Sequence, residues 1–133
     1  MIRYKRPDKK NALSLLEAAK KDLEFTLTLK VSEDAGSTIV RNIHNSFRMV
    51  GDALLISKGI EPTDHITSIK ELLKLNVKTS RPINLIDSIR RLRHSINYYG
   101  YRPKLNEVED AVSIAKTCFE PLYQEAEKIV SKL

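Results

Sequence analysis

The chain has 133 residues, of which 41% are hydrophobic and 30% are charged, and its formal net charge is +6. This length and composition are typical of one globular domain with its own core, and they exclude a disordered chain. The single cysteine, Cys118, excludes an internal disulfide and any metal site built from several cysteines. No apolar run is long enough to span a membrane, and no apolar segment follows the basic residues 1–10 as it would in a signal peptide. We therefore expect a single cytoplasmic domain over residues 1–133, with a basic N-terminal arm at residues 1–7 and no membrane contact.

Apolar residues recur every three or four positions through most of the chain, which is the spacing of helices with one buried face. The first helix is predicted from about Asp8 to Leu29. Ser32 is a favourable N-cap for the second helix, which should end near Lys58-Gly59. Pro62-Thr63-Asp64 should begin a shorter third helix.

Two further helices are expected in the remainder of the chain. Pro82 suits the first turn of the fourth helix, where the missing N–H costs nothing. Asn106 and Glu109 have the spacing of a capping box for the last helix, in which Pro121 should cause a kink near Thr117 or a division into two. The sequence thus predicts an all-α fold, an up-and-down four-helix bundle with one short extra helix.

Basic residues gather in two blocks, residues 1–10 and residues 81–104, while the remainder of the chain is slightly acidic. If both blocks lie on one surface, they could bind the phosphates of RNA or of a nucleotide. The alternative is a solvated basic tail and one basic helix that bind no ligand.

The second block contains the most informative segment, Ile89 to Tyr101, in which cationic and aromatic side chains are concentrated. On a helix, Leu92 and Ile96 fall on an apolar stripe, and Arg93 lies at the edge of that stripe with its stem half covered. Such donors could hold an anion or a partner's carboxylate. The alternatives are helix-end packing for the tyrosines and an internal ion pair for Arg93. The acids considered for that ion pair are Glu17, Asp52 and Asp110. The candidate ligand- or partner-binding residues are Arg90, Arg93, His94, Asn97, Tyr98, Tyr99 and Tyr101.

The remaining chemically versatile residues do not form a recognisable site in the sequence. His44 and His65 lie on different predicted helices without a paired acid nearby, so no metal site is expected. Cys118 follows the apolar pattern of the last helix and is expected to be a buried structural thiol. No glycine-rich phosphate loop and no recognisable nucleophile is present. We therefore expect no cofactor.

The order of these features resembles that of the HEPN superfamily, the higher eukaryotes and prokaryotes nucleotide-binding domains, over about residues 10–130. The resemblance is carried by the small and apolar residues that close the second helix on Gly59, by His65 at the start of the third helix, and by the segment Leu92–Tyr98 in the fourth. An Ala-Val-x-x-Ala-x-x-x-Phe pattern from Ala111 follows in the last helix. The resemblance implies a homodimer across the signature helix, a small nucleotidyltransferase as a partner, and a role among toxin–antitoxin proteins.

The signature of nuclease members of that family is an arginine, a polar residue, three further residues and a histidine. Arg93 and His94 match the first two positions, but Tyr98 stands where the histidine is expected. A phenol is a poor general base at neutral pH, whereas an imidazole suits that role. The resemblance therefore points to a branch with a degenerate nuclease motif, whose catalytic candidates are Arg93, His94 and Tyr98.

The function expected from the sequence is a non-catalytic interaction module or a nucleotide- and RNA-binding module. The alternative is a metal-independent, toxin-like ribonuclease, in which Arg93 stabilises the transition state and His94 acts as the base from a shifted position. A third interpretation is a purely structural, partner-binding bundle whose basic side chains form only internal ion pairs. Binding to phosphate should weaken with rising ionic strength, which separates the first interpretation from the third.

Overall fold

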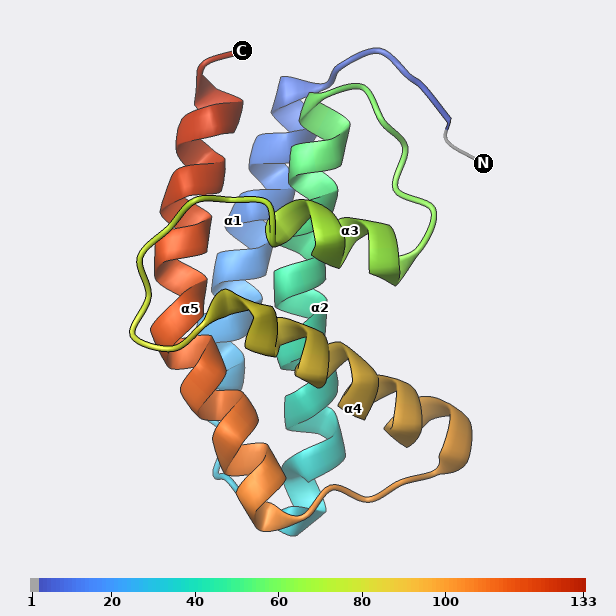
Figure 1. Ribbon diagram of the computed structural model, residues 1–133, viewed down its shortest axis with the longest axis vertical. Helices are drawn as coiled ribbons and strands as arrows, with labels where there is room; N and C mark the ends of the chain where they lie inside the picture. Colours follow the sequence, from blue (N-terminus) through green and yellow to red (C-terminus); the bar gives the residue numbers. More distant parts are fainter. Residues whose placement is uncertain (1–2) are drawn as a thin grey trace.

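The computed structural model describes residues 3–133, and within this range the chain forms five α-helices (Figure 1). The helices are α1 (Lys9–Thr26), α2 (Glu33–Ser57), α3 (His65–Leu72), α4 (Ile86–Tyr99) and α5 (Leu105–Ser131). A 3-10 turn (Ile83–Leu85) directly precedes α4. Over the same range the β-structure is limited to an isolated antiparallel bridge between Tyr4 and Ile60. The all-α fold class predicted from the sequence is confirmed.

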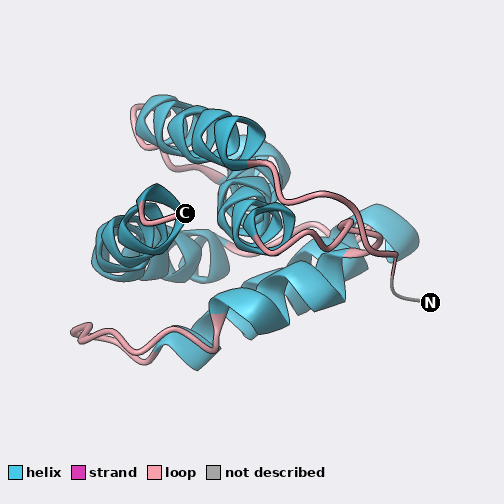
Figure 2. Cartoon of the chain, turned by 90° about the horizontal axis from the view of Figure 1, so that it is seen from above, coloured by secondary structure: helices cyan, strands magenta, loops and turns pink. Residues whose placement is uncertain are grey.

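The helices form a long bundle with a second layer on one side of it. Helices α1, α2 and α5 run along the length of the molecule, whereas α4 crosses in front of α2 at an angle (Figure 1). Figure 2, seen from above, shows that α4 lies in its own layer beside the long helices. Because only one face of α4 rests on α2, the outer face and the C-terminal end of α4 remain open to solvent.

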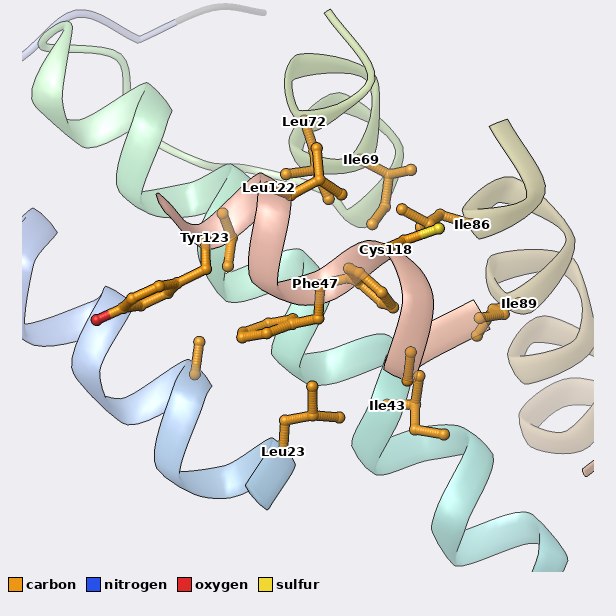
Figure 3. Close-up of a cluster of buried hydrophobic side chains, with 14 of the residues drawn as sticks. Leu23, Ile43, Phe47, Ile69, Leu72, Ile86, Ile89, Cys118, Leu122 and Tyr123 are labelled. Atoms are coloured by element: carbon orange, nitrogen blue, oxygen red, sulfur yellow. The ribbon is translucent and has the colours of Figure 1, made fainter. Parts of the chain in front are cut away.

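Side chains from all five helices meet in one core (Figure 3). Phe47 of α2 is fully buried at its centre and makes an edge-to-face contact with Phe119 of α5, with 5.6 Å between the ring centroids. Cys118 is fully buried beside them, and its thiol donates to the backbone oxygen of Arg81 at 3.5 Å. The prediction of a buried structural thiol is confirmed.

Helix α3 packs very closely against α2 at Gly51. A Cβ atom placed on Gly51 would lie 2.1 Å from the backbone oxygen of Ser68, so only glycine fits at this position. The next residue, Asp52, is buried and accepts hydrogen bonds from the Ser68 hydroxyl and from Arg48. These contacts fix the position of α3 on α2.

The start of α2 agrees with the prediction, whereas the end of α1 and the start of α4 differ from it. Ser32 caps α2 as predicted, because its hydroxyl oxygen accepts the N–H of Ala35 at 3.1 Å. Helix α1 ends at Thr26 and not at Leu29, because the last N–H groups bond three residues back and tighten the chain into a turn. Pro82 lies just outside the fourth helix, ahead of the 3-10 turn that leads into α4.

The start of α5 corrects the predicted capping box of Asn106 and Glu109. The backbone N–H of Lys104 donates to the carboxylate of Glu107 at 2.9 Å, so the acid that closes the helix start is Glu107. Extended backbone at Lys104, directly after Pro103, lets the helix begin at Leu105. Pro121 does not divide α5, which is continuous and bends along its length (Figure 1).

Within residues 3–133, none of the helices combines the length and the apolar character that a bilayer crossing requires.

Candidate functional site

Helix α4 places its side chains in three different environments. Ile86, Ile89 and Ile96 are buried against the bundle, and Arg93 is half-buried at the edge of that face. The helix ends at Gly100, whose positive φ of 63° turns the chain away, and its N–H donates to the backbone oxygen of Ser95. The candidate residues in the last turn of α4 are therefore exposed to solvent.

Most of the arginines of α4 are already paired within the helix. Arg90 donates from Nε to Asp87 at 2.8 Å, and Arg91 contacts the other oxygen of the same carboxylate at 2.8 Å. The hydrogen bond from Arg90 and the two nearby charges hold the pKa of Asp87 below its usual value. Arg90 thus has the internal ion pair that the structural interpretation expected.

Arg93 differs from its neighbours because no carboxylate within residues 3–133 lies at ion-pair distance from it. The three acids considered as its partners are engaged elsewhere. Glu17 pairs with Lys21, Asp52 with Arg48, and Asp110 with Arg81. A guanidinium without an acidic partner can bind a carboxylate or a phosphate group.

Three aromatic rings cluster at the exposed end of α4. The ring centroid of His94 lies 4.5 Å from that of Tyr98 and 5.9 Å from that of Tyr99. Tyr98 is 69% exposed and Tyr99 is 78% exposed. We call His94, Tyr98 and Tyr99 the ring cluster. Large exposed rings form a surface on which flat ligands can stack.

The other two candidates have partners inside the chain. The Asn97 side-chain oxygen accepts the Arg41 Nε–H at 2.7 Å, which ties α4 to α2. The Tyr101 hydroxyl donates to Glu107 at 2.6 Å, and this hydrogen bond raises the pKa of Tyr101. Both residues therefore position the end of α4, and the ring cluster is the part that remains available.

The structure also brings together His44 and His65, which the sequence placed on separate helices. Their ring centroids are 5.2 Å apart where α3 meets α2. Burial, and then the charge of Arg93, lowers the pKa of His44 to about 3. The same two causes, in the same order, lower the pKa of His65. The apolar neighbours of His44 in the helical pattern indicated burial, but the pairing depends on the docking of α3.

These histidines do not form a metal centre. In the part of the chain that the structure describes, no group of three or more His, Cys, Asp or Glu side chains is arranged to hold a metal ion. The positive charge of Arg93 beside both rings also opposes a cation.

The basic N-terminal block lies apart from α4. Figure 1 shows the arm beside the C-terminal end of α2, with α3 between the arm and α4. Arg3 and Lys5 both pair with Glu61, and a hollow of about 290 Å³ lies between the arm and α2. This hollow includes neither the ring cluster nor Arg93.

Comparison of the chain with protein-family models, with curated proteins and with solved structures gave no match.

Proposed function

We propose that this chain is a HEPN-like, non-catalytic module that binds single-stranded RNA through the C-terminal half of α4. The observations that carry the proposal are the exposed ring cluster at the end of α4 and Arg93, which precedes it in the same helix and has no acidic partner within residues 3–133. A guanidinium recognises phosphate oxygens, and neighbouring rings stack on unpaired bases. The order and lengths of the helices support the HEPN-like part of the proposal.

Among the arginines of the second basic block, residues 81–104, Arg93 differs in having no acidic partner within residues 3–133. Arg81 is held by Asp110 at 2.8 Å, and Arg102 lies 4.0 Å from Asp34. With Arg90 and Arg91 shared by Asp87, Arg93 is the cation of α4 that has no acidic partner within residues 3–133. The net charge of the whole chain would bring RNA near, and Arg93 would fix its position.

The identity of the residue at position 98 supports binding without cleavage. Tyr98 occupies the place of the nuclease histidine, and its ring packs against His94 with 4.5 Å between the centroids. His94 therefore belongs to a stacking surface, with its ring between two phenols. By the same resemblance, the module would act as a homodimer or with a small nucleotidyltransferase.

The proposal predicts that the double substitution Tyr98→Ala, Tyr99→Ala weakens binding to a fluorescent single-stranded RNA of about eight nucleotides by about tenfold or more. The reason is that each base–aromatic stack contributes about 1–3 kcal/mol. Fluorescence anisotropy at several salt concentrations measures the affinity, which should fall as the ionic strength rises.

Phe25→Ala is the matched control, because Phe25 is an aromatic residue on α1 that is 65% exposed and lies outside the ring cluster. The control should bind RNA as the wild type does. An equal loss of RNA affinity in Phe25→Ala and in the double tyrosine variant, or no RNA binding by the wild type, would exclude the RNA-binding surface. Analysis of the same RNA after incubation with a chelator tests the ribonuclease alternative, for which cleavage abolished by Arg93→Ala is the diagnostic result.

A further inference from the structure

The neighbouring rings of His44 and His65, tilted by 32° to each other, have two buried nitrogen atoms that lack hydrogen-bond partners in the described part of the chain. His44 is only 1% exposed, and its Nε2 has no partner within residues 3–133. The Nδ1 atom of His65 is buried and unpartnered in the same way. Leaving a polar atom buried without a hydrogen bond destabilises a protein, so native structures nearly always provide a partner. Two such atoms at one junction of helices indicate that something other than this chain completes the site.

The positive charge of Arg93 acts on the same junction. Its charge is the strongest of the charges that act on both imidazole rings, and it lowers the pKa of each after the effect of burial. The charged and titratable groups around the two rings are Arg48 and Asp52 on α2, Asp64 at the start of α3, and Arg90 and Arg93 on α4.

Neither of those two acids is available to Arg93 or to the imidazoles. Asp52 accepts from Arg48 and from the Ser68 hydroxyl. Asp64 caps α3 by accepting the backbone N–H of Thr67 at 2.6 Å. The junction therefore carries one uncompensated positive charge while both histidines are neutral.

The chemistry of this junction specifies its ligand. Two unpartnered imidazole nitrogens, one on α2 and one on α3, lie in the field of a positive charge from α4, which suits a tetrahedral oxyanion and opposes a metal ion. A neutral ligand could satisfy the imidazoles but would leave the charge of Arg93 uncompensated. His44 is buried, whereas His65 and Arg93 are only half-buried, so a ligand would approach from the side of His65 and Arg93.

We propose that His44, His65 and Arg93 form a site for a phosphate monoester, of the kind found at the end of an RNA strand or on a nucleotide. A terminal phosphate protrudes from the rest of the ligand and can reach the buried imidazole, which a phosphate within a strand reaches less easily. The site itself does not depend on the proposed function, but the assignment of its phosphate to RNA rests on that function.

Sulfate is the first probe, because it has the shape of phosphate and stays fully ionised from about pH 8 to about pH 6. We expect sulfate to bind the wild type and to shift the imidazole Cε1–H resonances of His44 and His65.

Arg93→Gln should weaken sulfate binding by about tenfold or more, because it removes a charged hydrogen-bond donor. Arg91→Gln is the matched control on the same helix, where the arginine side chain is 75% exposed, and it should leave binding unchanged. Absence of sulfate binding, or an equal loss of affinity in the two variants, would overturn the site.

Two oligonucleotides then distinguish the sources of the phosphate. A strand with a 5′-phosphate should bind more tightly than the same strand with a 5′-hydroxyl, and Arg93→Gln should abolish that difference. Inorganic phosphate that binds as tightly as the 5′-phosphorylated strand would overturn the assignment to a nucleic acid. Loss of the ring cluster should weaken RNA binding without affecting sulfate, so failure of the RNA proposal and failure of this site give different results.

Discussion

Gly51→Ala is expected to lower the free energy of unfolding by about 2 kcal/mol, after an overpacking cost of about 3 kcal/mol at the upper end of the usual range. The new Cβ would lie 2.1 Å from the backbone oxygen of Ser68, and a backbone atom cannot move aside without displacing α3. This cost exceeds the gain of about 1 kcal/mol that alanine offers over glycine in a helix interior. Urea unfolding followed by circular dichroism measures the change.

Gly36→Ala is the matched control, because Gly36 also lies in α2 and gains the same helix propensity. There the new Cβ would meet a methyl group of Val108 at 2.8 Å, and a side chain can adjust more easily than the backbone. We expect the free energy of unfolding to fall by less than half as much as it does for Gly51→Ala. Equal stabilities of the two variants would contradict the close packing of α3 on α2.

The stability of the wild type is expected to fall by about 2 kcal/mol between about pH 7.5 and about pH 5, through His44 alone. Burial and the charge of Arg93 lower the pKa of His44 from 6.5 to about 3 in the folded chain. As the pH falls below about 6.5, the unfolded chain binds a proton that the folded chain does not, so the unfolded state gains stability. The contribution of neutral His44 to the free energy of unfolding is fully present above about pH 6.5 and is lost progressively toward pH 3. His65 adds to this loss in the same direction.

His44→Phe tests this prediction, because phenylalanine fills the buried position with a ring that cannot be protonated. Urea midpoints measured across the same pH range should vary less in this variant than in the wild type. His94→Gln, which removes an exposed imidazole, should retain the dependence of the wild type. If the urea midpoint of His44→Phe changes with pH as much as that of the wild type, His44 does not control the loss of stability in acid.

The fold was predictable because its helices are long and strongly periodic. The second helix illustrates this best, since Ser32 and the residues after it carry every signal of a helix start. The exact ends were less predictable, because they depend on single hydrogen bonds. Glu107 closes the start of α5 where the spacing favoured Glu109, and Thr26 ends α1 where the apolar pattern continued. The angle at which α4 crosses α2 follows from packing between helices, which periodicity does not describe.

The candidate site was predictable in part, and for a clear physical reason. Helical phase alone places Arg93 at the edge of the buried face, where the structure finds it half-buried. Whether an arginine has an acidic partner depends on contacts between helices, so the sequence left the pairing of Arg93 open. The junction of His44 and His65 was missed for the same reason, because residues 21 positions apart meet only when α3 docks on α2.

The most direct test of the central claim is a map of amide chemical shifts in the labelled protein as a short single-stranded RNA is added. We predict that the largest changes lie in α4 between Arg93 and Tyr99 and at the start of α3 near His65, which together surround the free cation. Changes concentrated in the basic arm at residues 3–10 and in the hollow beside Glu61 would contradict the claim. The claim would also be contradicted if the addition of RNA at low salt left the spectrum of the protein unchanged.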